Sequence, residues 1–465
     1  MKKKKAEPLP EVEMPDAAEL PEGWLLTSVG EQFQIVGGGT PSTKKPEYWE
    51  GDIPWISSAD IYGIKKIVPR RKINENALKN SAANLVPKGS IIVVTRVSLG
   101  RLAICETPIS FSQDCHALIP KTDSVDPEFA LYYLSRAVQS FKKDSRGTTI
   151  SGVTVNVVSS LPFLLPPLAE QQRIVARVEA LLTQVNAARD RLSRVPLIMK
   201  KFRQAVLAAA CSGRLTEGWR GENASSISSE DFLKHALNFR RKYYTNKSNK
   251  KYKEPETPSD DFSFSLPSEW TWATLEQLSQ FVTDGDHYPP KRVSKGIPHL
   301  TSKHVKKWKL SFDDCSYISP DDFEIVKVRY EPQEGDVILT CVGTIGETAI
   351  VPKDFTFSAD RNLAAIRLFP EFFLPQMLQF ILNSPPWENH IKTASGSTAQ
   401  PHIYLKDLRA MAVPLPPLAE QHEIVRRVGL LFERADAIDR EVAAAGRRCE
   451  RLTQAVLGKA FAGRL

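Results

Sequence analysis

The 465-residue sequence lacks several features that mark particular classes of enzymes, secreted proteins and membrane proteins. It contains no Gly-x-x-x-x-Gly-Lys-Ser/Thr loop, which excludes a P-loop nucleotide hydrolase. It has no run of 18 apolar residues, and the lysines at residues 2–5 precede an acidic, proline-rich stretch instead of the apolar core of a signal peptide. Its six cysteines form no Cys-x-x-Cys pair and no zinc-ligand spacing, so we interpret them as reduced thiols of a cytoplasmic protein.

Three short segments come close to catalytic motifs without matching them. Asn-Ser-Pro-Pro-Trp at residues 383–387 is close to the Asn-Pro-Pro-aromatic motif of adenine methyltransferases, but it has an inserted serine and no glycine-rich cofactor turn. Residues 321–327 approach a nuclease carboxylate set with the wrong spacing and are better interpreted as a proline-capped helix start. Asp-Gly-Asp-His at residues 284–287 has no second cluster of metal ligands. We therefore predict that this chain catalyses no reaction and binds no metal or cofactor itself.

The main positive feature is an internal repeat. Residues 165–215 and 415–465 align without a gap, and 21 of these 51 positions are identical. Both copies begin Leu-Pro-Pro-Leu-Ala-Glu-Gln, continue through a Gln-Ala-Val-Leu run and end Gly-Arg-Leu. A chain that repeats itself at half its length usually performs the same task twice.

Both copies carry the heptad pattern of a coiled coil. Apolar residues recur at alternating steps of four and three, which favours two long helices that pack antiparallel on each other over two unrelated amphipathic helices. Thirty-three helical residues would span about 50 Å at 1.5 Å per residue, and Pro196 predicts a kink or a short break. The predicted helix-pair positions include Ile174, Val178, Leu181 and Val185 in the first copy and Ile424, Val428, Leu431, Ile438 and Leu452 in the second.

The segments before the two helices repeat more faintly. Residues 20–24 match residues 266–270, and residues 89–94 align with residues 335–340 at the same offset. Short β-branched runs that end in a glycine turn are typical of strands. We predict an α+β protein: two similar, strand-rich, mixed α/β domains, joined and spaced by the helix pair in a pseudo-twofold repeat. The predicted order is a tail (1–19), a first domain (20–165), a first helix (166–215), a basic linker (216–264), a second domain (265–415) and a second helix (416–465).

Basic residues gather at comparable places in the two halves. The net charge is +8 and the isoelectric point is about 9.0, which is compatible with a polyanionic partner. A solvated face would explain either cluster alone, but their repetition favours phosphate contacts. The linker, with a short helix near residues 230–244, is interpreted as a solubilising tether. The clusters are Lys65, Lys66, Arg70, Arg71 and Lys72, and then Lys291, Arg292, Lys295, Lys303, Lys306, Lys307 and Lys309.

On these motifs the chain resembles the specificity (S) subunit of type I restriction-modification enzymes, from about residue 20 to residue 465. The most specific segments are the two Leu-Pro-Pro-Leu-Ala-Glu-Gln helices and the sequence KFRQAVLAAACSGRLTEGWR at residues 201–220. The glycine-rich residues 37–42, with Tyr-Trp at 48–49 and Ile-Pro-Trp at 53–55, are similar to the opening of many target-recognition domains. Residues 284–287 resemble another such opening, although Asp286 stands where a hydroxyl residue is frequent.

The resemblance implies the following function. Each domain would read one half of a bipartite sequence in double-stranded DNA through the major groove, and the helix pair would set the unread gap. The partners would be two adenine methyltransferase (M) subunits, which use S-adenosylmethionine and flip the adenine out of the stack, and ATP-dependent endonuclease/translocase (R) subunits, which use ATP and Mg. Catalytic and cofactor residues would then lie on those partners, and no membrane would be involved.

Candidate DNA contacts lie at the glycine turns and in the basic stretches. The turn at residues 37–40 also has backbone N–H groups that could hold a phosphate, and arginine is suited to bidentate contact with guanine. Ordinary exposed surface is the alternative for each single residue. The candidates are Thr40, Ser42, Lys44, Lys45, Ser57, Ser58, Arg70, Arg71, Arg96, Ser98 and Arg101 in the first domain, and His287, Lys291, Arg292, Ser302, Lys303, His304 and Thr344 in the second.

Two other classes of function stay open from the sequence. A non-catalytic coiled-coil scaffold with two protein-binding domains would show no salt-dependent affinity for DNA, whereas a DNA reader would lose affinity steeply as salt rises. A DNA-recognition subunit of another phage-defence system would share the architecture and differ in its partners.

Overall fold

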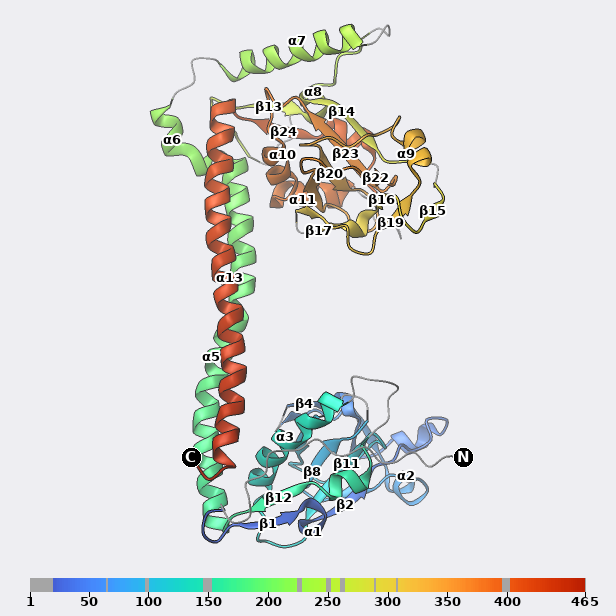
Figure 1. Ribbon diagram of the computed structural model, residues 1–465, viewed down its shortest axis with the longest axis vertical. Helices are drawn as coiled ribbons and strands as arrows, with labels where there is room; N and C mark the ends of the chain where they lie inside the picture. The colour runs from blue at the N-terminus through green and yellow to red at the C-terminus, as the bar shows by residue number, and fades with distance from the viewer. Residues whose placement is uncertain are drawn as a thin grey trace. The chain divides into compact units, whose positions relative to one another are not determined.

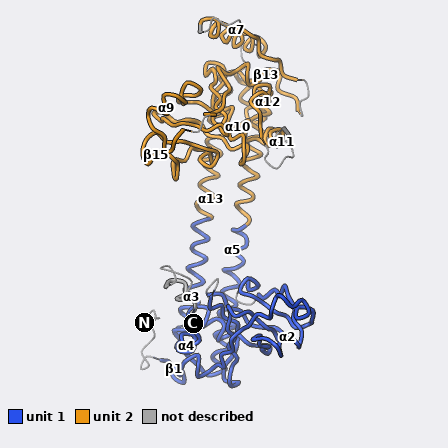
Figure 2. Tube along the Cα trace, turned by 90° about the vertical axis from the view of Figure 1, so that its right-hand side faces the viewer, with its two compact units in different colours: residues 1–193, 443–465 blue, residues 194–442 orange. Residues whose placement is uncertain are grey.

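The structure is a computed structural model that describes residues 20–63, 66–96, 100–144, 153–223, 228–247, 252–259, 264–287, 290–306, 308–394 and 402–464. The chain divides into two compact units, residues 1–193 with 443–465, and residues 194–442 (Figure 2). Each unit combines one mixed domain with one end of each long helix. Within the described residues, no helix is long and apolar enough to cross a membrane.

The first domain is built around two four-stranded sheets. The antiparallel sheet has the order β2-β11-β8-β9, and the mixed sheet has the order β6-β3-β10-β7. The all-apolar strand β8 serves two cores, because Ile91 and Val93 face the core under helix α3 while Ile92 and Val94 face the core shared with the mixed sheet. The strands are β2 (Phe33–Gly37), β3 (Ile53–Ile56), β6 (Arg71–Ile73), β7 (Leu85–Val86), β8 (Ile91–Val94), β9 (Leu102–Ile104), β10 (Ile109–Phe111) and β11 (Cys115–Pro120), and α3 is Pro127–Asp144.

Smaller elements complete this domain. Strand β1 pairs antiparallel with β12 just before the long helix α5, and α1 begins with a capping box between Ser28 and Glu31. These elements are β1 (Leu25–Ser28), α1 (Val29–Gln32), η2 (Pro46–Trp49), η3 (Ser58–Asp60), β4 (Ile61–Gly63), β5 (Lys66–Ile67), α2 (Glu75–Lys79), α4 (Val155–Ser159) and β12 (Pro162–Leu165).

The second domain repeats this plan. Its sheets have the orders β14-β23-β20-β21 and β15-β19-β16-β22, and the capping box between Thr274 and Gln277 on α8 matches that on α1. The strands are β13 (Thr271–Thr274), β14 (Ser279–Asp284), β15 (Arg292–Val293), β16 (Ile297–Leu300), β17 (Val305–Lys306), β18 (Lys309–Leu310), β19 (Ser316–Ile318), β20 (Val337–Thr340), β21 (Thr348–Ile350), β22 (Ser358–Ala359), β23 (Leu363–Leu368) and β24 (Ala412–Leu415). The helices are α8 (Leu275–Leu278), η5 (Ser302–His304), α9 (Pro320–Val326), α10 (Pro375–Leu382), α11 (Pro385–Ala394) and α12 (Leu405–Ala410).

The two long helices are α5 (Leu168–Cys211) and α13 (Leu418–Ala460), drawn in green and red in Figure 1. In the first unit the start of α5 packs on the end of α13, through Ile174 and Val178 against Leu457. In the second unit the end of α5 packs on the start of α13, where Ile424 and Val428 are buried. The pairing is therefore antiparallel, as predicted, and the helices are longer than expected, with 44 and 43 residues.

Several details of the helix prediction are wrong. Helix α5 continues through Pro196, so the short break that was one of the two expected outcomes is absent. Ile438 and Leu452 are exposed by 44% and 53%, so the strict heptad phase does not hold along α13. An undistorted helix drifts against a seven-residue repeat. Near Ile438 an ion pair joins the two helices in place of apolar packing. Arg203 of α5 donates to Asp436 and Asp439 of α13 at 2.5 and 2.8 Å. Leu181, Val185 and Leu431 are half-buried.

The glutamine of the repeated Leu-Pro-Pro-Leu-Ala-Glu-Gln motif explains why the motif recurs. Both glutamine side chains are fully buried, and each joins the start of its long helix to its own domain. Gln171 accepts a hydrogen bond from the Asp126 N–H and donates to the carbonyl oxygens of Ser124 and Pro166, all at 2.8 Å. Gln421 makes the same three kinds of bond, to Leu374, Phe372 and Pro416, at 2.8–2.9 Å.

The preceding glutamate behaves differently in the two copies. Glu420 is buried and accepts hydrogen bonds from Thr216 Oγ1 at 2.6 Å, Arg220 Nη2 at 2.8 Å and Trp270 Nε1 at 2.8 Å. It therefore joins the start of α13 to the segment after α5 and to the start of the second domain. Glu170 instead binds the exposed Arg173 on its own helix.

The segment predicted as a tether is a packed part of the second unit. It contains η4 (Arg214–Thr216), α6 (Glu217–Glu222) and α7 (Ser229–Lys247), so the predicted helix near residues 230–244 is confirmed and is longer. The tether interpretation is wrong, because Arg240 is 5% exposed and donates to the carbonyl oxygen of Ser279. Phe239 packs edge-on against Phe369. The charges of α7 hid an apolar face.

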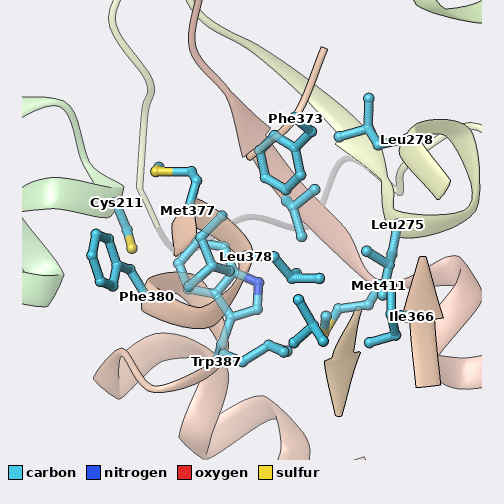
Figure 3. Close-up of a cluster of buried hydrophobic side chains, with 14 of the residues drawn as sticks. Cys211, Leu275, Leu278, Ile366, Phe373, Met377, Leu378, Phe380, Trp387 and Met411 are labelled. Carbon is cyan, nitrogen blue, oxygen red and sulfur yellow. The ribbon is translucent and has the colours of Figure 1, made fainter. Parts of the chain in front are cut away.

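The largest apolar cluster lies in the second unit and includes the end of α5. Figure 3 shows Cys211 beside Met377 and Phe380 of α10, with Trp387 of α11 in the same cluster. Burial raises the pKa of the Cys211 thiol to about 12, so this cysteine is an apolar filler and no nucleophile. All six cysteines are free thiols, as predicted.

Candidate nucleic-acid interface

In the first domain the glycine turn is held by the strands beneath it. Gly38 N–H donates to the carbonyl oxygen of Cys115 at 3.2 Å and Gly39 N–H to that of Phe111 at 2.9 Å. A Cβ atom on Gly38 would lie 2.1 Å from the carbonyl oxygen of Ser112, which explains the glycine there. The proposal that these N–H groups hold a phosphate is wrong for Gly38 and Gly39, since both are already donated.

The turn after β3 is organised by a buried carboxylate. Asp60 accepts hydrogen bonds from the N–H and hydroxyl of Ser57, both at 2.8 Å, and Arg70 Nε lies 2.5 Å from Asp60 Oδ1. Burial alone raises the pKa of Asp60, but the hydrogen bonds from Ser57 and Arg70 outweigh it and hold this pKa below its usual value. Ser58 is buried at 6% exposure, so its side chain is not presented for a DNA contact, contrary to our prediction.

The other candidates of the first domain lie around these two turns. Thr40 donates to the Gln113 side chain, Lys45 Nζ donates to the Tyr48 hydroxyl at 3.0 Å, and Arg101 Nη1 lies 3.3 Å from the carbonyl oxygen of Ile61. Ser42 is exposed, and the exposed Lys44, Arg71 and Arg96 form no ion pair with other described residues. Ser98 and Lys65 of the first domain lie outside the described residues, as does Lys307 of the second domain.

Trp49 is a feature that sequence reasoning missed. The Arg71 guanidinium lies over its ring, 5.3 Å from the centroid, and the ring meets Trp55 edge-on at 5.1 Å. This stack orients an exposed arginine on β6 without neutralising it. The Tyr-Trp pair at residues 48–49 was the signal that could have found it.

In the second domain an acidic residue organises the loop at residues 284–287, which is equivalent to the glycine turn of the first domain. Asp284 Oδ1 accepts from Arg329 Nε at 2.9 Å, and Asp284 Oδ2 lies 2.8 Å from Nε2 of the exposed His287. Burial alone raises the pKa of Asp284, but these two partners outweigh it and lower the pKa below its usual value. Among the residues that the structure describes, no three His, Cys, Asp or Glu side chains gather to hold a metal ion.

The remaining candidates of this domain divide into exposed and buried groups. Lys291, Arg292, Lys303 and Thr344 are exposed. Arg292 Nη1 donates to the carbonyl oxygen of Pro290 at 3.0 Å, Ser302 Oγ to that of Val342 at 3.1 Å, and Lys303 Nζ lies 3.4 Å from that of Asp314.

His304 is misassigned as a DNA contact. It is 2% exposed, and its Nδ1 accepts a hydrogen bond from the Thr301 N–H at 2.8 Å. Thr301 and His304 thus form on η5 the same capping arrangement that Ser57 and Asp60 form on η3. A Ser/Thr three residues before a partner side chain is a capping signal that the sequence contained.

The segments that approach catalytic motifs have structural roles. Asn383 Nδ2 donates to Thr348 Oγ1 and to the carbonyl oxygen of Gln379, both at 2.7 Å, and Trp387 is buried in the core. Helix α9 begins at Pro320 with Ser319 as its N-cap, which confirms the proline-capped helix start.

Comparison with known proteins agrees with this geometry. The family model described as type I restriction modification DNA specificity domain matches residues 21–195 and 267–440. The chain is 29% identical over 366 residues to the specificity subunit of type I restriction enzyme EcoBI from Escherichia coli, which covers 78% of this chain and 70% of that one. It is 27% identical over 453 residues to the EcoDI specificity subunit from Escherichia coli, covering 97% of this chain and 90% of the relative.

Solved structures share the fold. A chain from a structure of a type I restriction-modification system superposes with a TM-score of 0.64 at 21% identity and covers 96% of this chain and 99% of that one. The HsdS subunit from Thermoanaerobacter tengcongensis gives a TM-score of 0.52 at 22% identity and covers 96% of this chain and 98% of its own. With two matched domains joined to one repeated helix motif, this chain belongs to the family of type I restriction-modification DNA specificity subunits.

Proposed function

We propose that this chain directs a type I restriction-modification complex to a bipartite DNA sequence, with each domain reading one half. One observation carries the proposal: the two domains share one fold but present different side chains at equivalent positions. Each domain is joined to its long helix by the same buried glutamine, Gln171 or Gln421. Equal skeletons with diverged faces suit an asymmetric two-part target.

The exposed cations support DNA as the ligand. Lys44, Arg71 and Arg96 on the first domain and Lys291, Arg292 and Lys303 on the second are available for phosphate or base contacts. A wrong base pair costs a specific protein–DNA complex about 1–3 kcal/mol, so one small domain gives limited discrimination. Two readers on one chain combine their discrimination and also require a set spacing between the halves.

The helix pair is the proposed ruler. Helices α5 and α13 have 44 and 43 residues, and each is continuous in sequence with a domain core at its start. An insertion in both helices would lengthen the unread gap without touching either reader. An addition of four residues lengthens a helix by about 6 Å, which corresponds to about two base pairs.

The chemistry is assigned to partner subunits, and this chain is proposed to be non-catalytic. Two adenine methyltransferase subunits would bind S-adenosylmethionine and flip the target adenine out of the duplex. The endonuclease/translocase subunits would bind ATP and Mg. The cytoplasm, where bacterial DNA is found, is the proposed compartment.

The test is a methylation map of a methylation-free bacterial host that expresses this chain with its cognate methyltransferase. The proposal expects N6-methyladenine in one two-part motif with a constant gap, and no methylation when this chain is omitted. Replacement of residues 20–165 by the same segment of a relative should change one half of the motif and leave the other half unchanged.

Two outcomes would contradict the proposal. A stable complex that leaves the genome unmethylated, and whose affinity for DNA does not fall as salt rises, would indicate a protein scaffold. DNA binding with steep salt dependence but no methylation would indicate a reader that serves another phage-defence system.

A further inference from the structure

One buried position differs in chemistry between the two domains. In the first domain, Ser110 of β10 lies opposite Trp55 of β3 in parallel register. Trp55 Nε1 donates to the carbonyl oxygen of Gly39 at 3.0 Å, which attaches the glycine turn to the sheet. The Ser110 hydroxyl is buried and has no hydrogen-bond partner among the described residues. An indole and a glycine therefore hold this turn.

The second domain has three polar side chains at the same place. Ser358 of β22 lies opposite His299 of β16 in the same parallel register. Asp286 takes the place of Gly39, since its N–H donates to the carbonyl oxygen of Ala359 on β22 at 2.8 Å, as that of Gly39 donates to β10. Asp286, His299 and Ser358 are all buried, with exposures of 8%, 1% and 2%.

The hydrogen bonds determine where the protons lie. The Ser358 hydroxyl donates its single proton to Asp286 Oδ2 at 3.0 Å. Its oxygen, 3.1 Å from His299 Nδ1, must then accept from that nitrogen. Neutral His299 therefore carries its proton on Nδ1 and leaves Nε2 as a bare acceptor, which is buried and has no partner among the described residues.

This arrangement is costly as a way to fill space. A buried carboxylate needs hydrogen-bond donors, and an unpaired buried acceptor destabilises the fold. The first domain holds the equivalent turn with an indole and no charge. The polar version lies beside His287, which is exposed, and His299 is two residues before the turn that carries Ser302 and Lys303. The destabilising polar cluster therefore lies next to the candidate DNA contacts of the second domain.

We propose that Asp286, Ser358 and His299 form a positioning network that holds residues 284–287 against β16 and so sets how the second domain reads its half of the target. The inference rests on the proposed function. These side chains act through the loop and are not themselves DNA contacts, because all three are buried.

Burial and the surrounding charges keep His299 neutral near neutral pH. Arg292 on β15, His304 on η5, Asp360 after β22 and His287 on the loop face the network. Burial, together with Arg292 and His304, lowers the pKa of His299 to about 4. Burial raises the pKa of Asp286 above its usual value, and the hydrogen bond from Ser358 and the charge of Arg292 oppose that rise.

The test compares two matched serine deletions in the full chain, expressed with its methyltransferase. Ser358→Ala removes the bridge between Asp286 and His299, whereas Ser110→Ala removes a hydroxyl that has no partner among the described residues. The measured quantity is methylation at host-genome sites correct in both halves, divided by methylation at sites with one wrong base in one half. For the half read by the second domain, Ser358→Ala should lower this ratio about tenfold, because the hydrogen bond that joins Asp286 to β22 is lost. Ser110→Ala should leave both halves unchanged.

A second pair of variants separates positioning from folding. Asp286→Asn keeps an oxygen that can accept the Ser358 proton and should retain the wild-type ratio, whereas Asp286→Ala should relax the second half as Ser358→Ala does. Thermal unfolding of each purified complex shows whether the variants fold. If Ser358→Ala does not fold, the comparison of Asp286→Asn with Asp286→Ala tests the network instead. Equal ratios for Ser358→Ala and Ser110→Ala, or equal relaxation of both halves, would overturn the network. A wild-type chain that directs no bipartite methylation would instead overturn the proposed function.

Discussion

The buried glutamate at the start of α13 offers a prediction with an internal control. Glu420 is 2% exposed and its partner Arg220 is 11% exposed, and they lie 2.8 Å apart. Removal of the carboxylate by Glu420→Ala leaves a buried guanidinium without its counter-charge, together with the donors of Thr216 and Trp270. Loss of one partner of a buried ion pair costs about 3–5 kcal/mol.

The same residue in the first copy should respond weakly. Within the part of the chain that the structure describes, the Glu170 carboxylate binds Arg173, one helical turn away, and the Arg173 side chain is 55% exposed. Water replaces such a partner readily, so Glu170→Ala should leave the stability close to that of the wild type. The two variants change the same letter of the same motif, and only the tertiary surroundings differ.

The assay is hydrogen–deuterium exchange of the full chain, measured separately on peptides from each unit. The units are followed separately because a single unfolding free energy is poorly defined for a chain with two units. Glu420→Ala should accelerate exchange in residues 214–222 and at the start of α13, and should lower the unfolding midpoint of that unit by about 10 °C. Glu170→Ala should change neither. Equal effects of the two variants, or a silent Glu420→Ala, would refute the assignment of a buried, stabilising ion pair.

Three further predictions concern single positions. Gln171→Ala and Gln421→Ala each remove three buried hydrogen bonds and should each destabilise their own unit by about 3 kcal/mol, measured by urea unfolding followed by exchange. Gly213→Ala should cost about 1–2 kcal/mol from its φ of +76° alone, and more because the added Cβ would lie 2.5 Å from Pro267 Cγ; a midpoint unchanged from wild type would contradict this. Because the folded pKa of His299, about 4, is below its usual value of 6.5, its contribution to stability is complete above pH 6.5 and is lost as pH falls toward 4, up to about 3 kcal/mol. His299→Gln should flatten that part of the stability–pH curve.

The sequence by itself determined the architecture. The repeat at residues 165–215 and 415–465 contained the helical apolar periodicity of α5 and α13, and the unbroken apolar run at residues 91–94 predicted a strand that is buried on both faces. Such patterns depend only on the local periodicity of the sequence. The apolar face of a helix or strand is buried away from water whichever segment packs against it. The sequence also contained a signal for the buried face of α7, because Phe232, Ala236 and Phe239 recur at helical spacing.

Tertiary structure alone decided which polar residues are presented and which are enclosed. Ser58 and His304 are residue types usually found at the surface, yet both are buried. Ser58 lies inside the capping box of η3, and His304 is a member of the capping box of η5. Glu170 and Glu420 are the same letter in the same motif, and only the fold gives Glu420 a partner 200 residues away. A side chain's exposure and charge environment depend on segments remote in the sequence, so local patterns predicted the helices and strands while the positions of these polar groups required the folded chain.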